Sequence, residues 1–308
     1  MDNVDNYIGR FAPSPTGSLH MGSLVAALGS YLRAKNHNGQ WLVRMEDLDP
    51  LREVPCVADE ILQTLEDHAL YWDGEVIYQS HSQRQALYSN ALQQLIDAGQ
   101  VYTCTCTRKV LIRAAERGEF GIIYPGTCAK AHHSFELSRA IRVRTHNDPV
   151  CFDDVYKGRQ CQNLQEELGD FVIKRSDGYF AYQLAVVVDD EAQGITEIVR
   201  GEDLLNNTQR QIHLQQLLGY KQPAYCHLPM VTNQQGQKLS KQTHAPALKK
   251  EDASLNLIQA LTFLGVYNPD NRTIDKNNLD KNPEKDILRL KHETPEAILQ
   301  WSILNNDL

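Results

Sequence analysis

The spacing of apolar residues near the N-terminus changes from a short run to a helical repeat. Residues 7–12 (YIGRFA) are mostly apolar and have the length of a buried strand. Apolar residues then recur at helical spacing, at Met21, Leu24, Val25, Leu28 and Leu32. This pattern predicts a strand, a tight loop containing Pro13, Pro15 and Gly17, and a helix. The unpaired backbone N–H groups at the start of such a helix can bind a phosphate.

Strand-like and helix-like segments continue to alternate up to about residue 100. Residues 40–46 are predicted as a second buried strand, and amphipathic helices are predicted at 57–70 and 82–98. Gly99 stands where a glycine commonly ends a helix. This alternation is typical of an α/β protein, and we expect a Rossmann-type, doubly wound parallel sheet.

The regular alternation breaks after residue 100. Glycines, prolines and cysteines interrupt residues 101–131, and short strands are then predicted at 139–144, 151–156 and 171–174. We therefore expect residues 101–175 to form an inserted α+β subdomain.

The second half of the chain returns to the pattern of the first. Residues 179–188 and 195–200 are apolar enough to be strands of the central sheet. A helix, a last strand and a polar loop are predicted next, at 207–218, 227–231 and 233–241. Two more helices are expected, at 255–264 and 284–302. The predicted organisation is a sheet in two halves (1–100 and 176–242) around the insertion, followed by a small helical region (243–308).

Composition and charge restrict the class of protein. The 308 residues carry 39 acidic and 31 basic side chains, and the net charge of −8 argues against a generally basic nucleic-acid-binding surface. The sequence has no signal peptide and no apolar run of membrane-spanning length, so we expect a cytoplasmic protein. Seven cysteines are an odd number, which favours reduced thiols or a metal site over a disulfide framework.

Charged residues stand at the predicted strand ends, where a parallel sheet forms its ligand crevice. Glu46 is suited to an ammonium group, and Arg10 and Arg200 are suited to carboxylates. The hydroxyl of Tyr182 can donate to a further oxygen. Together these groups fit an amino acid, although from spacing alone ordinary ion pairs explain the same residues.

Three cysteines favour a metal site within the insertion. Cys104 and Cys106 alternate on one extended segment, so both sulfurs point to the same side. Cys128 is a natural third ligand for zinc, which requires a fourth to complete a tetrahedron. The candidates for the fourth ligand are Tyr124, His132 and His133. Zinc chemistry by itself favours a histidine, and three buried cysteines without a metal are the alternative.

Two separated motifs resemble the signatures of class I aminoacyl-tRNA synthetases. The string P-S-P-T-G-x-L-H-x-G begins at Pro13, and the tetrapeptide K-L-S-K occupies residues 238–241. The first motif is similar to that of the glutamyl branch, R-F-A-P-S-P-T-G-x-L-H-I-G, from which only Met21 departs. Ser23 stands where the wider family has a second histidine, and we assign it no catalytic role.

This resemblance implies a glutamate pocket and an ATP site. The residues implied to bind L-glutamate are Arg10, Phe11, Ala12, Pro13, Ser14, Glu46, Tyr182 and Arg200. Those implied to contact ATP are His20, Gly22 and Lys241. The implied catalytic residues are His20, Lys238 and Lys241, which together with Mg²⁺ would stabilise charge on the ATP phosphates as pyrophosphate leaves.

The resemblance extends to short paralogues of the glutamyl enzyme. In these a C-x-C pair, a tyrosine and a cysteine four residues later share zinc, which implies one structural Zn²⁺ held by Cys104, Cys106, Tyr124 and Cys128. The paralogues lack a helical anticodon-binding domain, and this chain is expected to end where that domain would begin. The implied reaction is ATP-dependent activation of L-glutamate without tRNA, then transfer to queuosine in the anticodon of tRNA(Asp).

Three other functions remain open at this point. A truncated glutamyl-tRNA synthetase would charge the terminal adenosine of tRNA(Glu). A related ligase would join an amino acid to a small molecule without any RNA. A binding module without activity is the third, but it would have no need of His20 or of the K-L-S-K loop.

Overall fold

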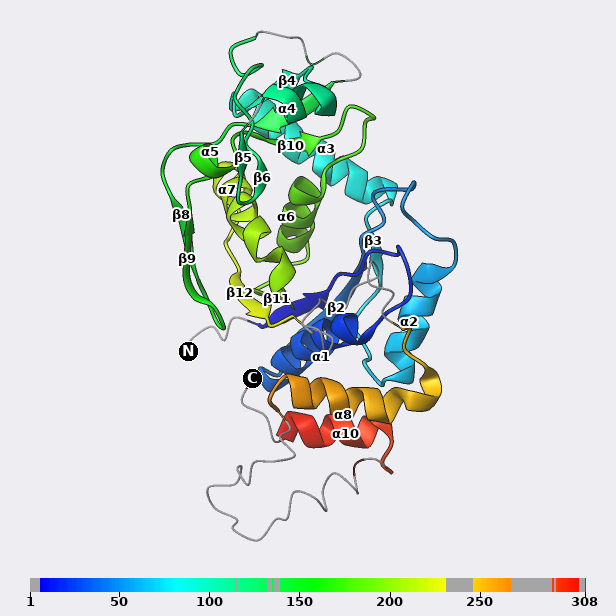
Figure 1. Cartoon of the computed structure of the whole chain (residues 1–308). Coiled ribbons are helices and arrows are strands. Elements are labelled where there is room, and N and C mark those ends of the chain that lie inside the picture. Colours follow the sequence, from blue (N-terminus) through cyan, green and yellow to red (C-terminus); the bar gives the residue numbers. More distant parts are fainter. Residues whose placement is uncertain are drawn as a thin grey trace.

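Parallel strands form the centre of the molecule in the computed structural model (Figure 1). The structure describes residues 6–114, 116–131, 135, 139–230, 246–266, 290, 292–304 and 308. In spatial order the strands are β3 (Ile77–Tyr78), β2 (Gln40–Met45), β1 (Ile8–Phe11), β11 (Glu197–Gly201), β12 (Ala224–Leu228) and β8 (Val150–Asp154). Their ladders are parallel, and the two sets meet where the backbone N–H of Thr196 donates to the carbonyl of Ile8 at 2.9 Å. The antiparallel strand β9 (Gly158–Gln162) continues the sheet beyond β8.

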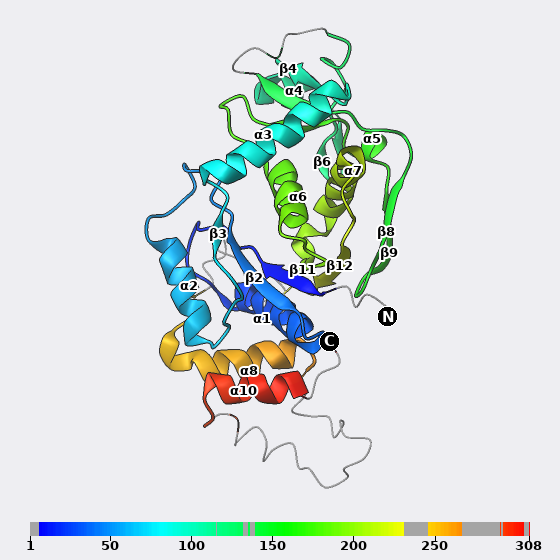
Figure 2. The ribbon, with the colours of Figure 1, turned by 180° about the vertical axis from the view of Figure 1, so that it is seen from behind.

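Helices cover both faces of this sheet, as the front and back views show (Figures 1 and 2). On one side lies α1 (Met21–Asn36), and on the other lie α6 (Tyr182–Ala192) and α7 (Thr208–Leu218). The outer helices are α2 (Val57–Asp67), α8 (Ala253–Phe263) and α10 (Pro295–Leu304), of which α8 and α10 form a further layer below α1. The predicted doubly wound α/β fold is confirmed. Among the described residues no helix has the length and apolarity required to cross a membrane.

A second, smaller sheet stands apart from the first, at the top of Figure 1. It is antiparallel, in the order β10 (Phe171–Lys174), β7 (Ala140–Val143) and β4 (Val101–Cys104). The elements around it are α3 (Ser82–Asp97), α4 (Arg108–Ala114), α5 (Leu164–Glu167), β5 (Arg117–Gly118) and β6 (Gly121–Ile122). Beside it, Tyr102, Cys104, Tyr124 and Cys128 form a small buried cluster of their own.

Residues 182–192 form a helix, and the strand predicted at 179–188 is wrong. Every residue from Gln183 to Asp190 is buried in α6, because this helix packs against α3, α7 and β10. A helix that is buried on all sides has no polar face, so its sequence resembles the apolar run of a buried strand. Tyr182 therefore begins a helix instead of lying on a strand.

Two other predicted strands differ from the structure. The strand predicted at 151–156 is found as β8, but it pairs with β12 of the large sheet and not with β7. The last strand lies at 224–228, earlier than the predicted 227–231. The helices predicted at 57–70, 82–98, 207–218 and 255–264 are found as α2, α3, α7 and α8, to within about one turn. Of the helix predicted at 284–302, the structure shows α10 at Pro295–Leu304, and residues 292–294 before it are not helical. The polar loop predicted at 233–241 lies outside the described residues.

Cys151 and Cys161 form a disulfide, whereas the sequence led us to expect reduced thiols. They lie opposite each other in register on β8 and β9, with Cα atoms 4.1 Å apart. Pairing of the two strands is what brings these side chains together, and a count of cysteines gives no sign of it. The free cysteines that the structure describes are Cys56, Cys104, Cys106, Cys128 and Cys226.

Gly169, between α5 and β10, is a position where we expect a side chain to destabilise the fold. Its φ is +69°, and an added Cβ would lie 2.3 Å from the carbonyl oxygen of Tyr124. Gly74 has a φ of +72° but open space at its Cβ position. Gly169→Ala should lower the free energy of unfolding by roughly 2–4 kcal/mol, and Gly74→Ala by only about 1 kcal/mol. Denaturant unfolding of both variants measures this, and equal losses would contradict the close approach to Tyr124.

Candidate active site

A cavity of about 310 Å³ opens at the carboxyl ends of β1, β2, β11 and β12, beside the first turn of α1. It is lined by every described residue that the sequence assigned to glutamate: Arg10, Phe11, Ala12, Pro13, Ser14, Glu46, Tyr182 and Arg200. His20 and Gly22 line it as well. Lys238 and Lys241 lie outside the described residues. The fold thus gathers into one cavity side chains that are far apart in the sequence.

His20 caps the helix that faces the cavity. It is the N-cap residue of α1, and its Nδ1 accepts a hydrogen bond from the backbone N–H of Ser23 at 3.3 Å. The first turn of α1 carries no acidic residue, and Gly22 and Ser23 line the cavity. The positive end of the helix dipole is therefore directed at the cavity, which favours an anionic ligand there.

Glu46 lines the cavity with a carboxylate that is almost completely buried. Its backbone N–H donates to the carbonyl of Pro13 at 2.9 Å, which holds the end of β2 against the loop after β1. Its side chain is only 9% exposed, and Oε1 accepts no hydrogen bond from any described residue, although Arg44 Nη2 lies 3.5 Å away. Burial raises the pKa of Glu46 to about 7, against the opposing effects of Arg44 and Arg10. A buried acceptor without a donor is suited to a cationic ligand.

Arg10 is held by a carboxylate that the pattern of the sequence did not point to. Its Nε and Nη2 donate to Asp190 at 3.0 and 3.4 Å, and Asp190 also accepts from Arg44 Nη2 at 2.8 Å. Despite burial, these two arginines hold the pKa of Asp190 below its ordinary value. One edge of the Arg10 guanidinium is thus engaged within the protein. The signal that could have indicated this is the pair of aspartates ending the apolar run of 184–190, because charges in a buried segment require partners.

Arg200 lies across the cavity from α1 and is almost fully buried, with 5% of its surface exposed. Its Nη1 approaches the hydroxyl of Tyr182 at 3.5 Å, and Nη2 donates to Thr208 Oγ1 at 2.8 Å. Burial, followed by the charge of Glu46, raises the pKa of Tyr182, so its hydroxyl stays protonated. The cavity thus offers arginine and tyrosine donors for a carboxylate and the Glu46 carboxylate for an ammonium group, and an amino acid carries both groups.

The predicted metal ligands meet beside the small sheet. The Sγ atoms of Cys104, Cys106 and Cys128 lie within 4.8 Å of one another, a group that could hold a metal ion. Tyr124 Oη lies 3.4 Å from Cys104 Sγ and 3.8 Å from Cys106 Sγ. Burial alone would raise the pKa of Cys128, but hydrogen bonds from Thr105, Tyr124 and Cys106 lower it to about 6. His132 and His133, the other candidates, lie outside the described residues.

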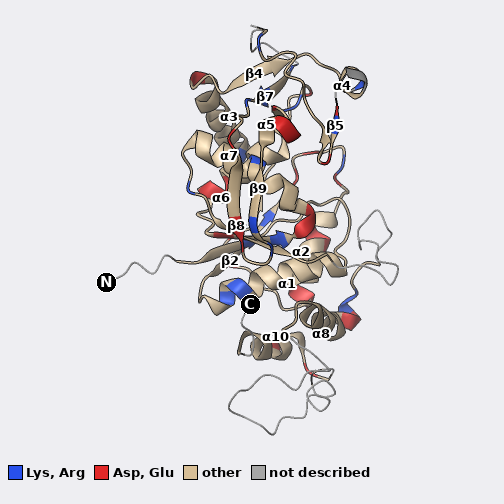
Figure 3. Ribbon diagram, turned by 60° about the vertical axis from the view of Figure 1, so that its left-hand side comes forward, with Lys and Arg blue, Asp and Glu red and all other residues tan. Residues whose placement is uncertain are grey.

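Basic and acidic residues are interspersed over the ribbon in the described part of the chain, as Figure 3 shows. This distribution agrees with the net charge of −8. A ligand with many phosphates would therefore be bound through local groups, such as the helix end at His20, and not through a broad basic face.

The fold and a family comparison define the class. Residues 8–294 match the catalytic domain of class I tRNA synthetases (E and Q). The structure of a glutamate tRNA ligase from Elizabethkingia meningosepticum in complex with its amino acid has a TM-score of 0.65 and 27% identity, over 77% of this chain and 52% of that one. This chain therefore spans about half of that solved structure. A glutamate-tRNA synthetase from Elizabethkingia anophelis shares the fold, with a TM-score of 0.70 at 22% identity over 96% of this chain and 70% of that one.

Closer relatives specify the family within this class. The glutamyl-Q tRNA(Asp) synthetase of Chromobacterium violaceum is 53% identical over 297 residues, which cover 96% of this chain and 94% of the relative. That of Neisseria meningitidis serogroup C is 48% identical over 305 residues, covering 98% and 96%. The chain belongs to the glutamyl-Q tRNA(Asp) synthetase family of the class I tRNA synthetases, and it is a ligase.

The raised pKa of Glu46 predicts that the contribution of this side chain to the stability of the protein without substrate falls as the pH rises. An ordinary glutamate has a pKa of 4.5, so between pH 4.5 and about 7 the folded protein binds a proton that the unfolded chain has released. The contribution of Glu46 to stability therefore falls as pH rises through this window. Glu46→Gln, which cannot ionise, should exceed the wild type by about 1–3 kcal/mol at pH 8 and by nothing at pH 4.5. Denaturant unfolding at both pH values tests this, and a difference independent of pH would contradict it.

Proposed function

We propose that this protein activates L-glutamate with ATP to form glutamyl-adenylate, without tRNA, and then transfers glutamate to queuosine in the anticodon of tRNA(Asp). The observation that carries the activation step is that one cavity is lined by the Glu46 carboxylate and by the donor groups of Arg200 and Tyr182. The choice of tRNA(Asp) and queuosine is supported by the name of the relatives at about 50% identity. The cytoplasmic location expected from the sequence belongs to this proposal, because ATP and tRNA must both reach the site.

In the proposed glutamate pocket each charged group of the substrate meets a group of opposite charge. The substrate ammonium meets the Glu46 carboxylate, and a substrate carboxylate meets Arg200 and the Tyr182 hydroxyl. The remaining edge of Arg10 and the loop of Ala12, Pro13 and Ser14 complete the wall. A second carboxylate distinguishes glutamate from glutamine, which would leave a buried cation without its partner.

Adenylate formation in this site needs alignment more than acid–base chemistry. The α-carboxylate of glutamate attacks the α-phosphorus of ATP, and the bond to pyrophosphate breaks. Because negative charge builds on the phosphates, the helix end at His20 and Gly22 stabilises it together with Mg²⁺ carried by ATP. Lys238 and Lys241 are assigned to the same phosphates by the resemblance of their motif alone.

We assign one structural zinc ion to Cys104, Cys106, Cys128 and Tyr124. Three thiols within reach of one another are a donor set that zinc prefers, and the Tyr124 hydroxyl is the fourth oxygen or sulfur donor beside them. The pKa of the Cys128 thiol is lowered to about 6, which favours the thiolate, the form that binds metal. Zinc there would hold the segment at 124–128 against β4.

Metal content tests this assignment. The purified protein should carry about one zinc per chain, and Cys104→Ala should abolish it because two thiols and a phenol bind zinc weakly. Tyr124→Phe should lower zinc retention against a chelator at least tenfold. The control is Cys56→Ala, an exposed free cysteine on the large sheet's side of the molecule, which should keep full zinc. Full retention in Tyr124→Phe, with loss in His132→Ala or His133→Ala, would identify a histidine as the fourth ligand.

The acceptor is tested with isolated tRNA(Asp). Glutamate-dependent exchange between pyrophosphate and ATP should occur without tRNA. Labelled glutamate should then be taken up by tRNA(Asp) that contains queuosine, and periodate cleavage of its cyclopentene diol should abolish uptake. Removal of the terminal adenosine should have no effect. Equal uptake by tRNA(Asp) without queuosine, or loss of uptake with the terminal adenosine, would make this enzyme an acceptor-end synthetase.

A further inference from the structure

Two buried residues behind the cavity hold Arg200 in a defined orientation. Arg200 on β11 and His227 on β12 are register partners in the parallel ladder. Arg200 Nε donates to His227 Nε2 at 3.1 Å, and the hydroxyl of Thr208 lies 3.2 Å from the same nitrogen. His227 is fully buried and does not line the cavity. Its contact with Arg200 is therefore made on the side away from the ligand.

Asp154 determines which nitrogen of His227 carries the proton. Its Oδ2 lies 2.6 Å from His227 Nδ1, and neither side chain is exposed. The carboxylate can only accept, so Nδ1 carries the proton and Nε2 presents a lone pair to the Arg200 N–H. Burial and the Arg200 charge lower the pKa of His227 to about 4, so the ring is neutral at pH 7. The direction of each hydrogen bond in the chain from Asp154 to Arg200 is thereby fixed.

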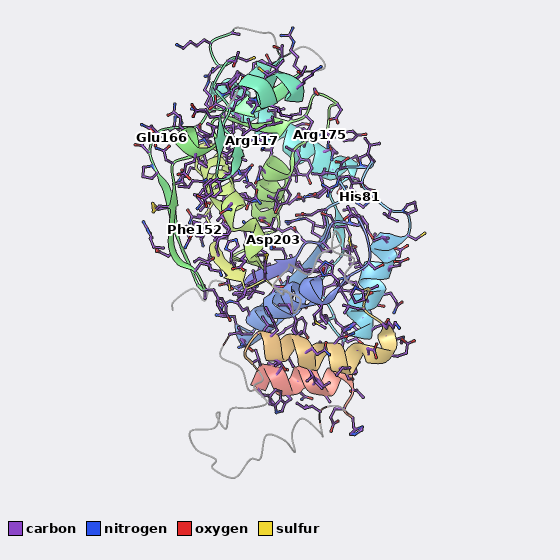
Figure 4. All side chains as sticks on the ribbon, in the orientation of Figure 1. His81, Arg117, Phe152, Glu166, Arg175 and Asp203 are labelled. Carbon is purple, nitrogen blue, oxygen red and sulfur yellow. A yellow bond between two sulfur atoms is a disulfide. The ribbon has the colours of Figure 1, made fainter. Side chains whose placement is uncertain are left out.

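The backbone holds Asp154 itself in place. Its Oδ1 accepts from the backbone N–H groups of Tyr156 and Lys157 at 3.0 and 2.9 Å, at the turn that joins β8 to β9. Two residues labelled in Figure 4 help to locate this chain of contacts: Phe152, at the left, lies on β8, the strand of Asp154, and Asp203, toward the centre, lies in the cavity wall. Strand β8 is thus connected to the cavity through three successive side chains, those of Asp154, His227 and Arg200.

From this geometry we propose that Asp154 and His227 are positioning residues, which aim the Arg200 guanidinium at a carboxylate of the amino-acid substrate. The proposal rests on the function proposed above, in which Arg200 binds glutamate. With Nε held by His227 and Nη2 by Thr208, the edge that remains toward the cavity is that of Nη1, next to Tyr182. An arginine without these contacts would sample several rotamers, and ordering it would cost substrate affinity.

The substitution Asp154→Asn tests the orientation of Arg200 without changing the packing of the protein, because the two side chains have the same shape. The amide oxygen of the new side chain can still accept the hydrogen bonds from the backbone N–H groups of Tyr156 and Lys157. In that orientation the amide NH₂ points toward His227 Nδ1. The imidazole must then carry its proton on Nε2, where it opposes the N–H of Arg200. Two donors facing each other repel, so Arg200 must turn away from its present orientation. The matched control is Asp153→Asn, since Asp153 is exposed and, among the described residues, forms an ion pair with Arg159 alone, on the same hairpin.

The experiment measures pyrophosphate exchange with the full-length protein at varied glutamate and varied ATP. For Asp154→Asn we expect the KM for glutamate to rise at least tenfold, while the KM for ATP and the melting temperature stay close to those of Asp153→Asn. His227→Phe should be impaired at least as much. His227→Gln, whose amide can accept from Arg200 and donate to Asp154, should recover part of the loss.

Three results would overturn the proposal. The first is a glutamate KM in Asp154→Asn within twofold of the control. The second is an equal rise in both KM values, which would indicate a general structural defect. The third is equal impairment by His227→Gln and His227→Phe. Absence of glutamate-dependent exchange in the wild type would instead remove the proposed function, and this proposal with it.

Discussion

The pairing of Asp190 with Arg10 and Arg44 is the interaction on which the cavity depends. It joins α6 to β1 and β2, and all three side chains are almost completely buried. Removing such charges from water costs several kcal/mol for each ion, and only their mutual contact offsets this cost. Because the contact has one good geometry, it determines where α6 lies over the strand ends. Tyr182, at the start of α6, and Glu46, after β2, are brought to the same cavity as a consequence.

The neighbouring Asp189 extends this network in the opposite direction. It accepts from Gln79 at 2.7 Å and from Tyr88 at 2.8 Å, and it pairs with Arg84. The network therefore runs from the cavity to α3, the helix that leads to the small sheet. Three arginines (Arg10, Arg44 and Arg84) and three carboxylates (Asp189, Asp190 and Glu46) balance in charge across the network, but Glu46 Oε1 accepts no hydrogen bond from a described residue. Buried groups that the network already holds in place are preorganised to bind a ligand without rearrangement of the protein.

The segment that carries Cys104, Cys106 and Cys128 is stabilised differently from the large sheet. One set of apolar side chains of the small sheet packs into a large core shared with α3, α6 and α7. The segment that carries the cysteines has much less to bury, and Tyr102, Cys104, Tyr124 and Cys128 form a separate cluster of four buried residues in the described part of the chain. A metal ion bound by the three sulfurs would contribute to this segment what a larger hydrophobic core contributes elsewhere. The large sheet needs no such aid, because helices bury it on both faces. The two regions can therefore be perturbed separately, one through sulfur chemistry and the other through charge.

The sequence by itself determined the features that local spacing encodes: the strand, loop and helix around His20, most helices, and the C-x-C pair whose two thiols point to the same side. The two motifs were also sufficient to indicate the family. Only the tertiary structure decided that 182–192 is a helix, that Cys151 meets Cys161, and that Arg10 is half engaged by a residue 180 positions away. The positions of Asp154 and His227 behind Arg200 belong to the same group. Such pairs depend on which strands lie side by side, and hydrophobic periodicity specifies a segment's buried face but not the segment that covers it.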